Sequence, residues 1–225
     1  MTTLVFWLDV DNTLINNDEI KNTLDEHIKV WLGSDMAQRF WEIYEEVREE
    51  GSVVDIPLAL KRFREETPLE KVDENTFAHV ESIFENFPFF QALYPYALET
   101  LQHLRTYGLT VIVSDGDRYF QAEKIVNSSL ADAVEGRVLI YIHKQEHLDE
   151  IQQRWPADHY VMIDDKPSIL ADTKQILQDR VTTVFVKQGK YAQQPLPAHF
   201  VPDISVDHIG DLRSYRAEQF LLPSA

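Results

Sequence analysis

The sequence predicts an α/β fold in which a Rossmann-like parallel sheet carries an inserted helical domain. Five short, strongly apolar runs occur along the chain of 225 residues, at 4–8, 109–113, 138–142, 160–163 and 183–186. Helix-like stretches lie between the later runs, at residues 118–128, 146–155 and 168–178. Roughly 75 residues after Leu14 read as helix, which is far more than one crossover connection needs.

Apolar runs without interruption are typical of strands that are buried on both faces of a parallel sheet. The first run, Leu-Val-Phe-Trp-Leu at residues 4–8, contains no polar residue. Strands that alternate with helices along a chain specify parallel neighbours joined by right-handed crossovers. The five runs therefore predict a parallel sheet.

The long insertion after the first run shows the apolar spacing of amphipathic helices. The residues with this spacing fall into three groups: Ile20, Leu24, Ile28 and Trp31; Phe40, Ile43, Tyr44 and Val47; Phe77, Val80, Phe84 and Phe87. Breaks between the helices are expected at Gly33, Gly51 and Pro68. We therefore divide the chain into two domains. Residues 1–14 and 91–225 form the main domain, and residues 15–90 form an inserted helical cap.

Charge and composition narrow the range of partners. The net charge of −17 opposes binding to nucleic acid or to an acidic membrane surface, because both require a cationic protein surface. A small molecule is the expected partner.

The absence of cysteine excludes disulfides and a cysteine nucleophile. Asp9 and Asp11 interrupt the apolar opening, which is too short for a signal peptide or a membrane helix, so we expect a cytoplasmic protein. The sequence does not indicate an oligomeric state.

Polar residues follow four of the apolar runs directly. Ligands of open parallel sheets bind beyond the carboxyl ends of the strands, so these positions are the first candidates for a site. The residues are Asp9, Asp11 and Thr13 after the first run, Ser114, Asp115 and Gly116 after the second, Lys144 after the third, and Asp164 and Asp165 at the end of the fourth. We expect them to form one site.

The residue types in this set suit phosphoryl transfer. The carboxylates form a hard, oxygen-only set of the kind that Mg²⁺ prefers, and the ion would offset the repulsion between the acids and a phosphate. The hydroxyl of Ser114, the backbone N–H groups near Asp115 and Gly116, and the charge of Lys144 can bind anionic oxygens. Transfer of a phosphoryl group mainly requires positioning and neutralisation of charge.

The ordered set of residues resembles the motifs of the haloacid dehalogenase-like (HAD) superfamily. The apolar run with Asp-x-Asp-x-Thr is similar to its first motif, Ser114 to its second, Lys144 to its third, and the pair Asp164 and Asp165 to its fourth. The resemblance spans about residues 4–190, and the helical insertion resembles the cap of the superfamily's first subclass. It implies the HAD fold and a hydrolase that acts on a small phosphorylated metabolite.

The resemblance also implies roles for single residues. Asp9 would be the nucleophile that forms an aspartyl-phosphate, and Asp11 the acid that protonates the leaving group and later activates water. Thr13 would hold the loop, while Ser114 and Lys144 would bind the phosphoryl group.

The implied metal ligands for Mg²⁺ are Asp9, the carbonyl of Asp11 and Asp165, with Asp164 as a supporting or alternate ligand. Many relatives carry a further acidic residue four positions after the fourth-motif ligand, and this chain has Ile169 there. A second acidic ligand at that point is therefore not expected.

Several alternatives stay open from the sequence. Lys124 and Lys166 compete with Lys144 for the third-motif role. A phosphosugar mutase, a 2-haloacid dehalogenase and a non-catalytic protein of the same fold compete with the phosphatase. A dehalogenase uses the same aspartate without metal and needs no acid at the position of Asp11, which favours the phosphatase. The candidate contacts of a substrate anion in the insertion are Arg48, Lys61, Arg62 and Arg64, although exposed helix faces often carry such residues.

Overall fold

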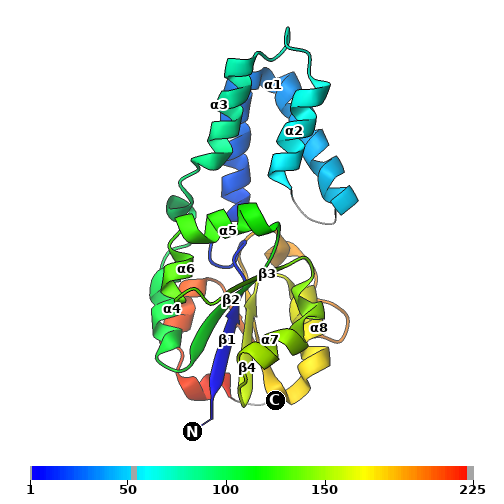
Figure 1. Ribbon diagram of the computed structural model, residues 1–225. Helices are drawn as coiled ribbons and strands as arrows, with labels where there is room; N and C mark the ends of the chain where they lie inside the picture. Colours follow the sequence, from blue (N-terminus) through cyan, green and yellow to red (C-terminus); the bar gives the residue numbers. More distant parts are fainter. Residues whose placement is uncertain (1, 52–54, 222–225) are drawn as a thin grey trace.

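A parallel sheet forms the centre of the computed structural model, which describes residues 2–51 and 55–221 (Figure 1). Its strands are β1 (Leu4–Leu8), β2 (Leu109–Asp115), β3 (Val138–Tyr141), β4 (His159–Asp164), β5 (Val181–Val186) and β6 (Ile204–Val206). They lie in the order β3-β2-β1-β4-β5-β6, and each adjacent pair is parallel. The carboxyl ends of β2, β1 and β4 therefore meet at one edge, and the predicted α/β fold is confirmed.

All five apolar runs form strands, within two residues of the predicted bounds. The sixth strand, β6, was not predicted. It has three residues and pairs with β5 alone, and its middle residue, Ser205, is exposed. A short edge strand with a solvent-facing polar residue has no apolar run by which to recognise it.

Side chains of β1 alternate between two hydrophobic cores, one on each face of the sheet. Leu4, Phe6 and Leu8 belong to the first core, to which the helices between residues 97 and 133 contribute. Val5 and Trp7 belong to the second, to which the helices between residues 148 and 177 contribute. Every residue of the strand thus faces a core, which explains why the run contains no polar residue.

Helices flank both faces of the sheet. They are α4 (Ala97–Arg105), α5 (Arg118–Asn127), α6 (Leu130–Ala133), α7 (Leu148–Arg154) and α8 (Pro167–Leu177). Short 3₁₀ helices are η1 (Phe89–Ala92), η2 (Lys144–Glu146), η3 (Gln178–Arg180), η4 (Lys190–Gln193), η5 (Ile209–Ser214) and η6 (Ala217–Phe220). The helical stretches predicted for α5, α7 and α8 are confirmed, whereas α4 and α6 were not predicted. None of the described helices is long and apolar enough to span a membrane.

The insertion after β1 is helical, and it stands beyond the carboxyl end of the sheet (Figure 1). It contains α1 (Asn17–Gly51), α2 (Ile56–Glu66) and α3 (Glu74–Glu85). The predicted break at Gly33 is present, since this residue has φ 73° and ψ 166° inside α1. The ring of Phe40 lies 5.7 Å from that of Phe63 and 5.5 Å from that of Phe84, so the aromatic residues form the core of the insertion. The domain limits at residues 15 and 90 stay a prediction.

The two connections between the sheet and the insertion run side by side. The N–H of Asn16 donates to the carbonyl of Ala92 at 2.8 Å, and the N–H of Tyr94 donates to that of Leu14 at 2.9 Å. Because both connections cross at one place, the helices of the insertion are joined to the sheet at a single point beside the end of β1.

Candidate active site

Asp9 follows β1 directly, and a tight turn comes after it. The carbonyl of Val10 accepts hydrogen bonds from three successive N–H groups, those of Thr13, Leu14 and Ile15, at 3.2, 2.9 and 3.0 Å. Asn12 adopts φ 60°, a left-handed conformation that asparagine tolerates. The hydroxyl of Thr13 donates to Asp9 Oδ2 at 3.4 Å. The turn therefore leaves Asp9 nearly buried, with 3% exposure, at the carboxyl end of the sheet.

Lys144 lies against Asp9. Its Nζ donates to Asp9 Oδ1 at 2.5 Å and to the carbonyl of Val113 at 3.1 Å, and it is 2.6 Å from Asp164 Oδ2. Burial raises the pKa of Asp9 to about 6, although the charge of Lys144 opposes the shift. Burial alone would lower the pKa of Lys144, but its carboxylate neighbours raise it, so this lysine is charged. Lys124 and Lys166, the alternatives to Lys144, do not contact Asp9. The Nζ of Lys124 pairs with Asp11, and no carboxylate of the described residues lies within 4 Å of the Nζ of Lys166.

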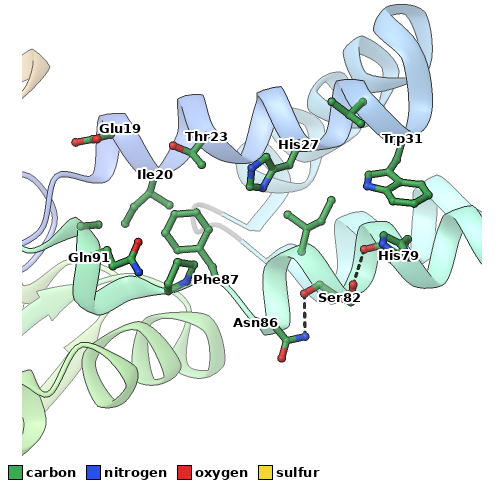
Figure 2. Close-up of a pocket in the computed structure, with 14 residues that line it drawn as sticks. Glu19, Ile20, Thr23, His27, Trp31, His79, Ser82, Asn86, Phe87 and Gln91 are labelled. Atoms are coloured by element: carbon green, nitrogen blue, oxygen red, sulfur yellow. Dashed lines mark hydrogen bonds between the residues drawn. The ribbon is translucent and has the colours of Figure 1, made fainter.

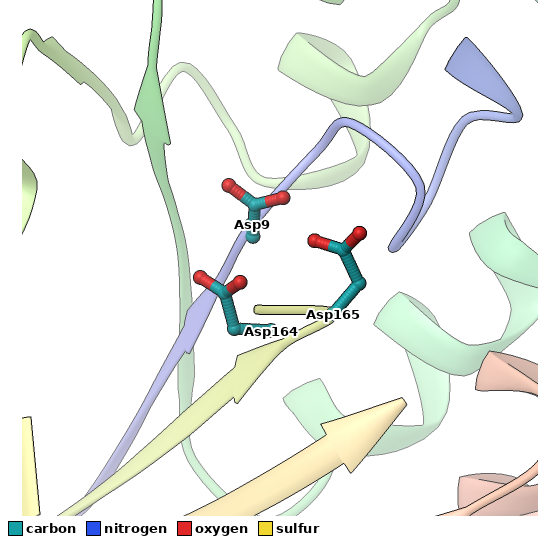
Figure 3. Close-up of side chains that lie close together, drawn as sticks. All are labelled: Asp9, Asp164 and Asp165. Carbon is teal, nitrogen blue, oxygen red and sulfur yellow. The ribbon is translucent and has the colours of Figure 1, made fainter. Parts of the chain in front are cut away.

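Asp9, Asp164 and Asp165 bring three carboxylates together at the ends of β1 and β4 (Figure 3). One oxygen from each lies within 4.8 Å of the others. Asp164 is engaged, because its second oxygen accepts the N–H of Lys166 at 2.8 Å. Both oxygens of Asp165 are buried, and neither has a hydrogen-bond partner among the described residues. Burial, and then the charges of Asp164 and Asp9, raises the pKa of Asp165 to about 9.

An unpaired buried carboxylate is costly unless a cation compensates it. The three acidic groups offer only oxygen atoms, and their spacing allows each to supply one ligand. The cluster can therefore hold a metal ion that prefers oxygen ligands.

Asp11 points away from this cluster toward α5. Its Oδ1 accepts hydrogen bonds from Lys124 Nζ at 2.7 Å and from Gln121 Nε2 at 3.3 Å. Lys124 is only 2% exposed and also donates to Asn17 Oδ1, at 3.0 Å. Burial would raise the pKa of Asp11, but the charge and hydrogen bond of Lys124 outweigh it and lower the pKa. Gln121 and Lys124, the two partners of Asp11, lie three positions apart in the sequence. This spacing places them on one face of a helix and was the one indication in the sequence that they act together.

Ser114 and its neighbours form the end of β2. Ser114 is buried, and its Oγ accepts a hydrogen bond from Gln121 Nε2 at 2.8 Å. The carboxylate of Asp115 accepts the N–H of Lys144 at 2.7 Å and so positions that residue. The N–H of Gly116, which belongs to the backbone groups predicted to bind an anion, donates to the carbonyl of Tyr141 at 2.8 Å. It is occupied because the chain continues its pairing with β3 beyond the strand end.

A cavity of about 410 Å³ opens above these residues, between the insertion and the sheet. Asp11, Asp115, Lys124 and Lys166 line it from the side of the sheet. The insertion contributes Lys21, Leu24, Trp41, Tyr44, Arg48 and Ile56. This cavity is where a small molecule can reach the polar residues at the strand ends.

The four basic residues of the insertion that were considered as anion contacts differ in position. Arg48 alone lines the cavity. Arg62 forms an ion pair with Glu50 at 2.5 Å, Arg64 with Glu74, and Lys61 lies 3.9 Å from Glu65.

A larger cavity, of about 610 Å³, lies between α1 and α3 (Figure 2). His27 and Trp31 line it from α1, and His79 and Ser82 from α3. None of the carboxylates or lysines that follow the strands reaches it. We therefore assign the chemistry to the smaller cavity.

Comparison with known proteins identifies the family. No family model matches the chain, and no curated protein matches it. Among solved structures, a protein of Burkholderia xenovorans LB400 that is classed as a haloacid dehalogenase-like hydrolase is 43% identical, with a TM-score of 0.87. The match covers 99% of this chain and 100% of that one.

More distant structures share the fold. The HAD hydrolase YfnB of Bacillus subtilis is 13% identical with a TM-score of 0.62, over 94% of this chain and 97% of that one. A 2-haloacid dehalogenase of Pseudomonas syringae pv. tomato DC3000 is 16% identical with a TM-score of 0.63, over 94% and 96%. The identity and full coverage of the Burkholderia protein, together with the strand order and the residues at the strand ends, show that this chain is a hydrolase of the haloacid dehalogenase-like superfamily.

Proposed function

We propose that the protein is a phosphatase that hydrolyses a small phosphate monoester, with Mg²⁺, through an aspartyl-phosphate formed on Asp9. The observation that carries this proposal is the carboxylate of Asp165, buried beside Asp9 and Asp164 without a hydrogen-bond partner among the described residues. A metal-dependent phosphatase needs such a group, whereas a dehalogenase that works through the same aspartate does not.

The donor set fits Mg²⁺. Asp9 and Asp165 would hold the ion together with the carbonyl of Asp11, and Asp164 would support them, because its carboxylate is already engaged by Lys144 and Lys166. Bound Mg²⁺ would neutralise charge on the phosphoryl oxygens. The structure of YfnB, which shares the fold, is described as bound to magnesium, and this analogy supports the assignment.

The chemistry proceeds in two displacements at phosphorus. First, an oxygen of Asp9 bonds to phosphorus as the bond to the leaving-group oxygen breaks, and Asp11 gives that oxygen a proton. Then water attacks phosphorus, Asp11 takes its proton, and the bond to Asp9 breaks to release inorganic phosphate. Ser114 and Lys144 hold the phosphoryl oxygens and stabilise their charge.

Lys124 positions Asp11 for this work. The ion pair at 2.7 Å orients the carboxylate of Asp11 and favours its ionised form, which accepts a proton from water in the second displacement. For the first displacement, Asp11 must bind a proton before it can give one to the leaving group. Because Lys124 and Gln121 both lie on α5, that helix fixes where the carboxylate points.

Replacing Lys124 by Met is expected to lower kcat about tenfold to a hundredfold, because Asp11 loses its orientation in a step to which acid–base catalysis contributes. KM should change little, and the phosphoenzyme trapped by an acid quench should increase. Lys29→Met, at an exposed position of α1, is the control. A Lys124→Met enzyme with unchanged kcat and unchanged phosphoenzyme would show that Lys124 does not position Asp11.

A screen of small phosphate monoesters with Mg²⁺ tests the function itself. We expect release of inorganic phosphate from at least one of them, and from a generic aryl phosphate. Transfer of phosphate between two positions of a sugar without phosphate release would identify a mutase. Halide release from a 2-haloacid in the presence of a chelator would identify a dehalogenase. No turnover of any compound would identify a non-catalytic protein.

A further inference from the structure

Five cationic side chains line the cavity above the strand ends, in a protein whose net charge is −17: Lys21, Arg48, Lys124, Lys166 and Lys190. Two of them have a role in the site already described. Lys124 forms an ion pair with Asp11, and Lys166 lies close enough to Asp9 and Asp164 for their charges to raise its pKa. Lys21, Arg48 and Lys190, which we call the outer cations, take no part in the proposed chemistry.

The acidic side chains that line the cavity form no ion pair with Lys21, Arg48 or Lys190, and each of them accepts a hydrogen bond from another donor. Asp11 pairs with Lys124. Asp115 accepts the N–H of Lys144, and Asp117 accepts the N–H groups at the start of α5. In the described part of the chain, no carboxylate lies within 4 Å of the Nζ of Lys21 or Lys190, and only Arg48 has such a partner, Glu45 at 2.8 Å.

The surroundings of Lys21 disfavour the charged form of its side chain. It is partly buried, and its Nζ lies 5.2 Å from the centre of the Tyr44 ring. Burial and the positive charges of Lys190 and Arg48 lower its pKa, against the opposing effect of Glu45 and Asp11. An anion among these three groups would remove that cost.

Lys190 is held in place by contacts with α1. Its N–H donates to Asp18 Oδ2 at 2.8 Å, and the other oxygen of Asp18 accepts from Asn12 Nδ2 at 3.3 Å. Gly189 has φ 65°, and a Cβ there would lie 2.4 Å from the side chain of Asn12, so only glycine permits this close approach. The Nζ of Lys190 lies 5.2 Å from the centre of the Tyr191 ring, and the contacts fix the backbone of Lys190 beside the cavity.

We propose that the outer cations bind a second anionic group of the substrate, so that the protein acts on phosphate monoesters that also carry a carboxylate or a second phosphate. This inference rests on the proposed phosphatase function. The phosphoryl group that reacts would be bound by Ser114 and Lys144, and the second anion by the part of the cavity that α1 and η4 line.

Matched substrates test the inference. The phosphate ester of a hydroxy acid is compared with the ester of the corresponding primary amide, and a bisphosphate of a diol with its monophosphate, each over a short series of chain lengths. We expect kcat/KM to be at least about tenfold higher for the anionic member of one pair, since hydrogen bonds to charged groups contribute more than neutral ones. The pair that shows the preference identifies the second anion as carboxylate or phosphate.

The variants Lys21→Gln and Lys190→Gln should each remove most of this preference, about fivefold to tenfold, while turnover of the neutral member stays unchanged. Lys21→Arg should retain the preference. Lys61→Gln, at an exposed position of α2 that does not line the cavity, is the control. Equal kcat/KM for the two members of both pairs, or an equal loss for both members in the variants, would overturn the proposal.

A binding measurement tests the second anion site independently of the phosphatase function. Titration calorimetry with a non-hydrolysable phosphonate that carries a terminal carboxylate, and with its amide, needs no turnover. Tighter binding of the carboxylate that disappears in Lys21→Gln supports the outer cations even if no phosphate ester is hydrolysed. If both phosphonates bind equally while an aryl phosphate is hydrolysed, the function stands and the second anion site is refuted. For a second phosphate, the corresponding pair is a bisphosphonate and its monophosphonate, and equal binding in both pairs is the refuting result.

Discussion

Asp9→Asn is expected to reduce phosphate release to the background rate, by a factor on the order of a million when a nucleophile is lost from a site that works as a unit. The amide keeps the shape of the carboxylate but does not attack phosphorus, so no covalent intermediate forms. Release of inorganic phosphate and acid-quench trapping of radiolabelled enzyme measure the two effects.

The variant should remain folded, because Lys144 keeps its second carboxylate partner, Asp164, at 2.6 Å. A thermal melt checks this point. Wild-type turnover in a folded Asp9→Asn protein would disprove the covalent mechanism, whatever the substrate is.

Asp11→Asn is the variant to compare with Asp9→Asn, because it keeps the nucleophile and removes the general acid and base. A loss of about a hundredfold to ten-thousandfold is expected. With a good leaving group, which needs little protonation, the first displacement should suffer less than the attack of water. A burst of product followed by slow turnover, with accumulated phosphoenzyme, should therefore appear. A steady rate without a burst would mean that Asp11 does not serve the second displacement.

Removal of Mg²⁺ is the second change with a large expected effect. Excess chelator should abolish turnover, and added Mg²⁺ should restore it, because the carboxylate of Asp165 has no other partner in the described part of the site. Full activity in chelator would refute the metal assignment. Halide release under the same conditions would establish the dehalogenase instead.

Asp165→Asn should weaken Mg²⁺ binding by more than about a hundredfold. Loss of a residue that only supports a metal ligand typically weakens metal binding by about tenfold to a hundredfold. Asp164→Asn should weaken it less, because that carboxylate already pairs with Lys144 and accepts the N–H of Lys166. Calorimetric titration with Mg²⁺ ranks the two variants. The reverse order would make Asp164 the direct ligand.

The sequence predicted the elements that carry a local signal. The five apolar runs became strands because each residue of a central parallel strand faces one of two cores, as Val5 and Leu4 do. The order of Asp9, Ser114, Lys144 and Asp165 along the chain predicted that they meet, because the ends of adjacent parallel strands share one edge of the sheet. The exposed face and three-residue length of β6 left it without such a signal.

By itself, the sequence therefore determined the α/β fold, the helical insertion and the group of residues at the strand ends. Only the tertiary structure decided which lysine contacts which aspartate: Lys144 reaches Asp9, while Lys124, on the helix after β2, reaches Asp11. It also decided that the N–H of Gly116 is occupied and that Asp165 has no partner among the described residues. Periodicity and spacing report how a chain folds locally, whereas the pairing of side chains more than a hundred positions apart depends on how strands and helices pack against one another.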